Sequence, residues 1–266
     1  MGTDGYRAAL IDLDGTLARA SLEITPRVAD AVARLAEHVA VAIVSSRDHV
    51  VVKRTAGSLG LSGLQISEGG ARIFDPVTGE TPWVRWLEPD DARGILTFLE
   101  QHSLAFTAVD RDGSPNAQSV SEIKEWRVTR ITAISLTESQ AREIAADFGV
   151  LGDVHTSIIV RIDNGDWMVD FTHATATKAT AVGRYAAIKG MAPSQLIAAG
   201  DSYNDLPLLE ACGLRIAMGN AAPELRAIAD YVAPTVDEDG LAVAIDEFLL
   251  PLLERHPTPK TRRRGR

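Results

Sequence analysis

The sequence predicts an α/β fold in which a parallel-sheet core carries an inserted α+β domain. Three continuous apolar runs indicate the core: residues 8–11, 39–44 and 196–199. Continuous rather than alternating hydrophobicity is typical of strands that are buried on both faces, as in a parallel sheet. Between the second and third runs the pattern changes to alternating strands and amphipathic helices, which favours a separate antiparallel layer with one free face.

Local signals place the other elements of the core. Thr25-Pro26 begins a helix, because it supplies a capping hydroxyl and a proline in the first turn. Val28, Val32 and Leu35 then follow at helical spacing, so this helix should lay an apolar face on the sheet. We expect further strands at 64–67, 214–218 and around 231–232, and further helices at 50–59, near 182–188 and at 240–250.

The insert has its own signals. Thr137 and Gln140 form the pattern of a capping box, which predicts a helix that runs to Gly149. An Asn164-Gly165 turn joins two apolar runs into a hairpin. We expect the other strands at 81–86, 106–109 and 128–136 and another helix at 89–102. The domain prediction is therefore a core of 1–78 and 177–256, an insert of 79–176 and a basic, disordered tail of 257–266.

The amino-acid composition restricts the classes of protein to which the chain can belong. With 45% hydrophobic and 24% charged residues among 266, the chain resembles ordinary soluble globular proteins. No apolar run approaches the roughly 20 residues that span a bilayer, so we expect no membrane association. The single cysteine permits no intrachain disulfide and favours a cytoplasmic location.

The charge of the chain is unevenly distributed. The net charge is −9, and without the five basic residues of the tail it would be −14. So acidic a body disfavours a nucleic-acid partner. We expect a small-molecule substrate and a monomer or homodimer.

Polar side chains follow each of the three apolar runs. Asp12, Asp14, Gly15 and Thr16 come after the first, Ser45 after the second, and Asp201 with Asp205 after the third. Ligands of open parallel α/β sheets bind beyond the carboxyl ends of the strands. We therefore expect residues almost two hundred positions apart to meet in one site.

These residue types suit phosphoryl transfer. Asp12 is placed as a nucleophile, because a carboxylate can form an aspartyl-phosphate. Asp14 would protonate the leaving alcohol and later activate water. Mg²⁺ prefers carboxylate, carbonyl and water oxygens, and together with Lys178 and Ser45 it would neutralise charge on the transferring phosphoryl group.

The motifs taken together resemble the haloacid dehalogenase superfamily. Asp12-Leu13-Asp14-Gly15-Thr16 matches its first motif, Ser45 its second, Lys178 its third and Gly200-Asp201-Ser202-x-Asn204-Asp205 its fourth. The position of the insert, with Ala217 to Ala221 and Glu238-Asp239-Gly240, resembles the Cof-type subfamily. That resemblance implies a Rossmann-like core and a type IIB α+β cap, the insert of residues 79–176.

The resemblance also implies roles. Asp12 is nucleophile and metal ligand, and Asp14 is the acid/base whose backbone carbonyl touches the metal. Asp201 binds Mg²⁺ directly, Asp205 binds it directly or through water, and Asn204 orients the phosphate. Gly15, Thr16, Ser45 and Ser46 would bind the phosphate.

Two stretches depart from the family pattern. The usual Thr-Gly-Arg is Ser45-Ser46-Arg47, and the usual Asn-Gly-Ala is Gly69-Gly70-Ala71. The first change puts the shape of the loop in question, and the second removes an amide that often faces substrate. We take as substrate candidates Arg47, Gly69, Gly70, Arg161 and His173, although a lone Arg or His in the hairpin is commonly structural.

The hypothesis from the sequence is a Mg²⁺-dependent phosphomonoester hydrolase that acts through an aspartyl-phosphate on a small phosphorylated metabolite, a sugar or polyol phosphate. One alternative is a phosphomutase, in which the same aspartates return the phosphate to substrate. Another is a regulatory protein that binds phosphorylated metabolites without turnover. A dehalogenase is disfavoured, because that chemistry needs neither a general acid at Asp14 nor the metal carboxylates.

Overall fold

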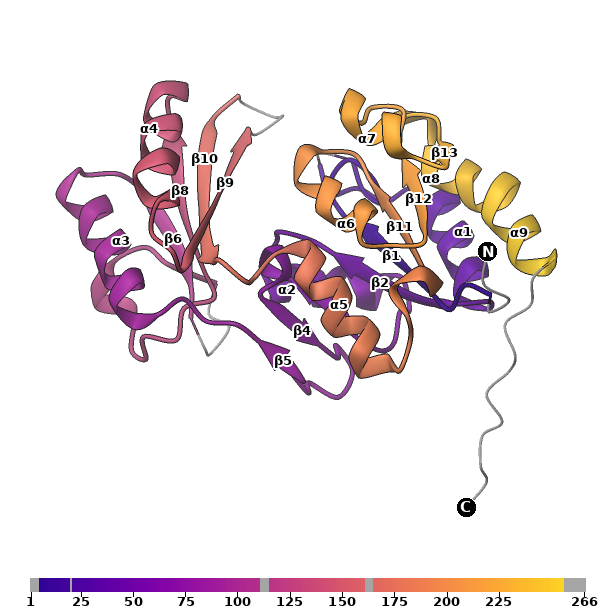
Figure 1. Ribbon diagram of the computed structural model, residues 1–266, viewed down its shortest axis with the longest axis horizontal. Coiled ribbons are helices and arrows are strands. Elements are labelled where there is room, and N and C mark those ends of the chain that lie inside the picture. Colours follow the sequence, from indigo (N-terminus) through magenta and orange to yellow (C-terminus); the bar gives the residue numbers. More distant parts are fainter. Residues whose placement is uncertain (1–4, 20, 111–114, 161–164, 256–266) are drawn as a thin grey trace, which may run out of the picture. The chain divides into compact units, whose positions relative to one another are not determined.

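The computed structural model describes residues 5–19, 21–110, 115–160 and 165–255 (Figure 1). The chain divides into two compact units. The first consists of Met1–Ile43, Ser58–Leu61 and Tyr185–Arg266, and the second of Val44–Gly57 and Ser62–Arg184.

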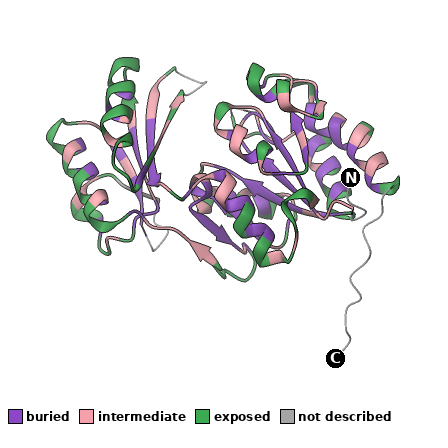
Figure 2. Cartoon of the chain, in the orientation of Figure 1, coloured by how far each residue is buried: buried purple, intermediate pink, exposed green. Residues whose placement is uncertain are grey.

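The first unit is built on a parallel sheet with the strand order β13-β12-β11-β1-β2. Strand β1 (Ala8–Asp12) pairs in parallel with β11 (Leu196–Gly200), so that Ile11 lies opposite Ala199. Every residue of these two strands is buried (Figure 2). The predicted core strands are therefore confirmed, and their register brings the residues after Ile11 and Ala199 to one edge. The other strands are β2 (Ala40–Val44), β12 (Leu214–Ala217) and β13 (Tyr231–Val232).

The first helix and the closing helix of the first unit begin where the sequence signals place them, whereas its two short helices between strands were not predicted. Thr25 caps α1 (Pro26–Ala36) by accepting a hydrogen bond from the Val28 amide, and the apolar stripe of α1 is buried as predicted. The predicted closing helix is a longer run in three segments. These are α8 (Gly240–Val243), a π-helical stretch η6 (Ala244–Leu249) and α9 (Leu250–Arg255), and the short helices between strands are α6 (Leu206–Glu210) and α7 (Pro223–Ile228).

The second unit contains a short mixed ladder. Val44 at the end of β2 pairs in parallel with Ile66 of β3 (Gln65–Ser67). Strand β4 (Arg72–Phe74), which the sequence did not predict, runs antiparallel to both β3 and β5 (Trp83–Val84). The strand predicted over 81–86 is thus only two residues long. Pro82, immediately before it, lacks the N–H that a longer ladder needs.

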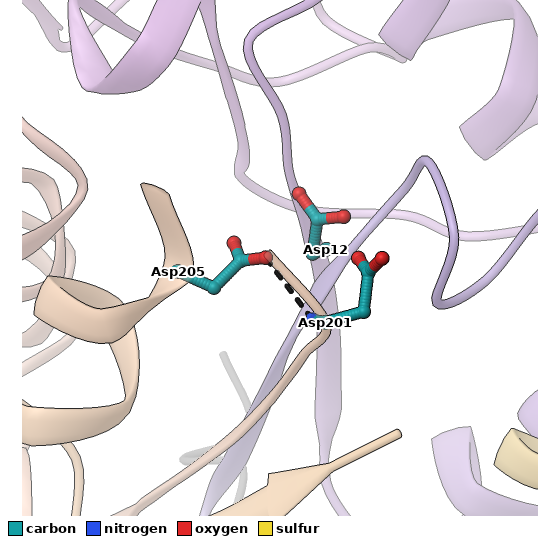
Figure 3. Close-up of side chains that lie close together, drawn as sticks. All are labelled: Asp12, Asp201 and Asp205. Carbon is teal, nitrogen blue, oxygen red and sulfur yellow. Dashed lines mark hydrogen bonds between the residues drawn. The ribbon is translucent and has the colours of Figure 1, made fainter. Parts of the chain in front are cut away.

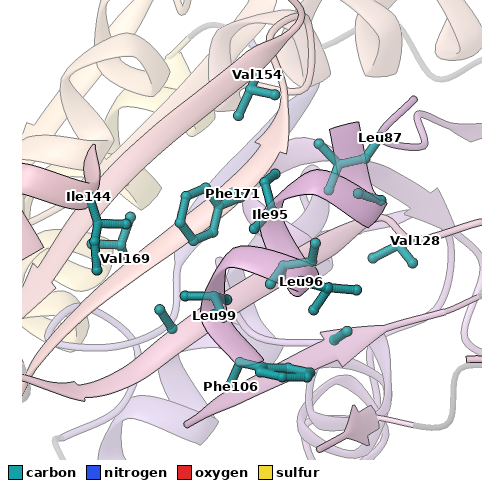
Figure 4. Close-up of a cluster of buried hydrophobic side chains, with 14 of the residues drawn as sticks. Leu87, Ile95, Leu96, Leu99, Phe106, Val128, Ile144, Val154, Val169 and Phe171 are labelled. Atoms are coloured by element: carbon teal, nitrogen blue, oxygen red, sulfur yellow. The ribbon is translucent and has the colours of Figure 1, made fainter. Parts of the chain in front are cut away.

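The antiparallel sheet of the second unit has the order β7-β6-β8-β10-β9. One face is apolar and packs against α3 (Pro89–Gln101) and α4 (Glu138–Gly149) (Figure 4). The predicted capping box of α4 is present. The prediction of an α/β core with an α+β cap is therefore confirmed. The strands are β6 (Phe106–Val109), β7 (Pro115–Ala117), β8 (Arg130–Leu136), β9 (Val154–Val160) and β10 (Trp167–His173), and the unit also holds α2 (His49–Ser58) and the start of α5 (Lys178–Lys189).

Some predictions fall outside the described residues. These predictions concern Arg161, Asn164 of the predicted hairpin turn, and the tail of 257–266. The limits of the core and cap, near residues 79 and 176, stay a prediction. Among the residues that the structure describes, no helix is both long and apolar enough to cross a bilayer.

A buried carboxylate holds the loop between β3 and β4. Glu68 is fully buried in a left-handed conformation with φ 55°. Its carboxylate accepts hydrogen bonds from the His49 amide at 3.2 Å and from Arg72 Nε at 3.1 and 3.2 Å. Burial alone would raise the pKa of Glu68, but the His49 hydrogen bond and the Arg72 charge lower that pKa to about 2.

We expect Glu68→Gln to lower the free energy of unfolding by about 3–5 kcal/mol at pH 7, because it leaves Arg72 buried without its counter-charge. A carboxyl group whose pKa is lowered by folding stabilises the fold at pH values above its unfolded-state pKa. This stabilisation is lost as the pH falls toward the folded-state pKa. The wild type should therefore lose this contribution between about pH 4.5 and about pH 2. In Glu68→Gln, the free energy of unfolding by urea should show no such loss over the same pH range.

The matched control is Glu138→Gln, since Glu138 pairs with Arg142 on an exposed helix face. Its effect should stay below about 1 kcal/mol. Equal effects of the two substitutions would contradict a structural role for the buried pair.

Candidate active site

Three carboxylates gather where β1 and β11 end. Asp12, Asp201 and Asp205 each offer an oxygen, and these oxygens lie within 4.8 Å of one another (Figure 3). Asp12 is 5% exposed and Asp205 is fully buried. The predicted meeting of the first and fourth motifs is therefore observed within the first unit.

The turn after β1 packs closely against the Asp201 side chain. The backbone amides of Leu17 and Ala18 donate to the Leu13 carbonyl, which closes the turn. Gly15 has φ 84°, and a side-chain Cβ at this position would lie 2.3 Å from Asp201 Oδ2. Only glycine lets the turn approach this carboxylate so closely. The side chain of Asp14 does not belong to the carboxylate group that the described residues form.

Two side chains hold the Asp201 carboxylate. Thr16 Oγ1 donates to Oδ1 at 3.2 Å, and Asn220 Nδ2 donates to Oδ2 at 3.1 Å. Asn220 also donates to the Gly15 carbonyl and accepts from the Val236 amide. Asn220 lies in the Cof-like stretch from Ala217 to Ala221, and the sequence pattern alone indicated no role for it. The structure assigns it the positioning of Asp201.

Asp205 is held by the turn that follows β11. Its Oδ2 accepts hydrogen bonds from the amides of Asp201 and Ser202, at 3.1 and 3.0 Å, and from the Ser202 hydroxyl. Gly200 permits this packing, since a Cβ there would lie 2.6 Å from the Cβ of Asp205. The Asn204 side-chain oxygen accepts from the Ser202 hydroxyl at 2.6 Å. The fourth motif thus fixes the Asp205 carboxylate through its own backbone and the Ser202 hydroxyl, whereas the Asp201 carboxylate is held from outside the motif.

The donor set fits a hard divalent cation. All three side chains offer carboxylate oxygens, the ligand type that Mg²⁺ and Ca²⁺ prefer. Buried carboxylates of like charge are costly unless a cation or a proton neutralises them. The group formed by Asp12, Asp201 and Asp205 can therefore hold a metal ion.

The second unit holds the predicted second and third motifs. The Ser45 side chain is buried, and its Oγ accepts from the Arg47 amide at 3.0 Å. Lys178 is 4% exposed and is the first residue of α5. Gly70, with φ 105°, packs against the backbone just before this helix, because a Cβ there would lie 2.4 Å from the Thr177 carbonyl oxygen. Gly70 therefore has a packing role, and a substrate role for it stays a prediction.

His173 ends β10 and is 2% exposed. Its Nδ1 accepts from the Thr175 amide at 3.0 Å, and its Nε2 lies 2.6 Å from Arg85 Nη2. Burial lowers the pKa of His173, and the Arg85 charge lowers it further. These contacts show a structural environment for this ring, while its predicted contact with substrate remains untested.

Comparison with known proteins identifies the family. The model of the haloacid dehalogenase-like hydrolases matches residues 9–245. The chain belongs to the haloacid dehalogenase-like hydrolase family. The resemblance seen in the sequence is thereby confirmed, and so is the predicted enzyme class, a haloacid dehalogenase-like phosphatase.

Relatives of this hydrolase cover nearly the whole chain. A phosphoglycolate phosphatase of Natronomonas pharaonis is 30% identical over 245 residues, which are 89% of this chain and 95% of that protein. A haloacid dehalogenase-like hydrolase structure from Bacteroides thetaiotaomicron has a TM-score of 0.79 at 21% identity and covers 91% of this chain and 99% of its own. A subclass IIB sugar phosphatase structure has a TM-score of 0.76 at 20% identity and covers 92% of this chain and 99% of its own. These structures share the fold.

We expect Gly15→Ala to lower kcat by about 100-fold or more, because displacing Asp201 spoils the spacing of the carboxylates. Gly60→Ala is the matched control, since Gly60 also has a positive φ, 64°, but has open space around its Cα. Both variants should melt at similar temperatures, and only Gly15→Ala should lose activity. Equal activities would mean that the contact with Asp201 is dispensable.

Proposed function

We propose that the protein is a Mg²⁺-dependent phosphomonoester hydrolase that acts on a small phosphorylated sugar or polyol through an aspartyl-phosphate. The group of three carboxylates at the ends of β1 and β11 carries this proposal. Asp12, Asp201 and Asp205 would hold Mg²⁺. When bound, Mg²⁺ would offset the negative charge of the phosphoryl group and of the carboxylates around it.

In the first half-reaction an Asp12 carboxylate oxygen attacks phosphorus, and the bond between phosphorus and the leaving oxygen breaks. Asp14 donates its proton to that oxygen, so that the product leaves as an alcohol. Ser45, Thr16 and the amides of the turn after β1 are proposed to bind the phosphoryl oxygens. Lys178 would balance their charge.

In the second half-reaction Asp14, now a carboxylate, takes a proton from water. The water oxygen attacks phosphorus, and the bond to the Asp12 oxygen breaks. Inorganic phosphate leaves, and both aspartates return to their starting states. Asp12 is only 5% exposed, which supports its role as the nucleophile, because a poorly hydrated carboxylate has less solvent to shed before it attacks phosphorus.

We expect Asp12→Asn to reduce phosphate release from p-nitrophenyl phosphate by at least about 10³-fold while the protein stays folded. An amide has the size of the carboxylate but is a very poor nucleophile. Asp30→Asn, on an exposed position of α1, is the control and should retain wild-type rates. The wild-type rate should fall to background when a chelator is added.

An Asp12→Asn rate within tenfold of wild type would remove Asp12 from the nucleophilic role. Full activity in excess chelator would contradict the metal dependence. A requirement for a bisphosphate activator would instead indicate a phosphomutase.

A further inference from the structure

The buried Glu68 belongs to a turn that contacts two of the predicted phosphate-binding motifs. The turn consists of Glu68, Gly69 and Gly70, and it follows β3 within the second unit. All three residues have positive φ values, 55°, 67° and 105°. The turn therefore has an unusual backbone, and its contacts explain what that backbone does.

The turn holds the loop after β2 at three points. The Glu68 amide donates to the Arg47 carbonyl at 2.8 Å, and the Gly69 amide donates to the Ser45 carbonyl at 3.1 Å. The Glu68 carboxylate accepts from the amide of His49, the first residue of α2, at 3.2 Å. These three hydrogen bonds continue the contact of β2 with β3 beyond the end of β2.

The shape of this loop does not depend on glycine. The family pattern has glycine where this chain has Ser46, but Ser46 is not among the described residues with a positive φ. A residue with a side chain therefore adopts this backbone without the strain of a positive φ. The Ser45 Oγ accepts from the Arg47 amide at 3.0 Å, while the turn holds the carbonyls of both residues. The loop is thus fixed from outside, by the turn of residues 68–70.

The same turn packs against the start of α5. Gly70 lies so close to the Thr177 carbonyl that a Cβ at this position would overlap it. The next residue is Lys178, the predicted third motif, which is buried. The turn therefore contacts the backbone at both the second and the third motif.

The side chain of Glu68 secures this turn. A left-handed backbone costs free energy for a residue that has a Cβ. The carboxylate offsets that cost, because Arg72 Nε donates to both of its oxygens and the His49 amide and Nδ1 lie 3.2 and 3.0 Å from Oε1. A carboxylate is also favoured beside the positive end of a helix dipole, here that of α2.

We propose that Glu68 is a positioning residue for phosphate binding, because it secures the turn that holds both the Ser45 loop and the backbone before Lys178. This inference rests on the proposed function, which takes Ser45 and Lys178 to interact with the phosphoryl group. Glu68 is fully buried, and both of its carboxylate oxygens accept hydrogen bonds within the protein. It therefore acts on the ligand through the backbone of the two motifs.

The test measures binding of inorganic phosphate to the full chain by calorimetry in the presence of Mg²⁺. Glu68→Gln replaces one carboxylate oxygen with an NH₂ group, which cannot accept from Arg72 or His49. The turn should then release the Ser45 loop. A hydrogen bond to a charged group contributes roughly 10- to 100-fold, so the loss of one such bond to phosphate should weaken binding by at least about tenfold.

Binding of Mn²⁺ without phosphate separates positioning from loss of folding. The carboxylates of Asp12, Asp201 and Asp205 belong to the first unit, so Glu68→Gln should leave Mn²⁺ affinity unchanged. Leu99→Ala is the control for stability, because Leu99 is fully buried in the apolar cluster of the second unit (Figure 4). Like Glu68→Gln it should lower the melting temperature, but it should leave phosphate affinity unchanged.

His49→Ala provides a second variant if Glu68→Gln does not fold. It removes the Nδ1 contact with Glu68 and should weaken phosphate binding by about threefold or more. A smaller change in Glu68→Gln, or in His49→Ala where that variant replaces it, would overturn the inference. So would an equal loss of phosphate affinity in Leu99→Ala, or a loss of Mn²⁺ affinity that accompanies the loss of phosphate affinity in the tested variant.

A separate result distinguishes failure of the proposed function. If the wild type binds phosphate but releases none from p-nitrophenyl phosphate with Mg²⁺, the hydrolase proposal fails. The calorimetric comparison of the same variants then still decides whether Glu68 positions the phosphate-binding loop. If the wild type binds no inorganic phosphate, the inference is overturned as well.

Discussion

Mutual repulsion among the carboxylates of Asp12, Asp201 and Asp205 has to be offset by the turns that follow β1 and β11. Two unit charges within 4.8 Å repel by at least about 3 kcal/mol at an effective dielectric constant of about 20. Three such pairs would consume most of the 5–15 kcal/mol by which domains are typically stable. A bound cation removes this penalty, and the hydrogen bonds from Thr16, Asn220 and the turn after β11 reduce it further.

The fold meets this constraint through strand register and glycine. Parallel pairing of Ile11 with Ala199 brings two distant turns to one sheet edge. Gly15 and Gly200 then let those turns approach the carboxylates of Asp201 and Asp205 more closely than any side chain would allow. The glycines of both motifs therefore serve the geometry of the carboxylates directly. In the cap, Asp170 is partnered differently, by a neighbouring arginine and a threonine hydroxyl.

Sequence patterns predicted those helices and strands that interactions between residues close in sequence determine. The cap of α1 at Thr25, the capping box of α4 and the buried β1 all follow from nearest neighbours. Strand β4 was missed because three residues are too few to establish a period. The role of Asn220 was missed because it depends on a turn 205 residues earlier in the chain. The contacts of Asp170 with Thr132 and Arg130 were not predicted, because they depend on which strands pair in the cap sheet.

The most direct test of the metal site is binding of Mn²⁺, a paramagnetic substitute for Mg²⁺, measured by electron paramagnetic resonance without substrate. We expect one Mn²⁺ per chain in the wild type. We expect Asp201→Asn to weaken that binding by at least about tenfold, whereas Asp30→Asn should leave it unchanged. A wild type without stoichiometric binding would contradict the central claim, as would an Asp201→Asn protein with wild-type affinity.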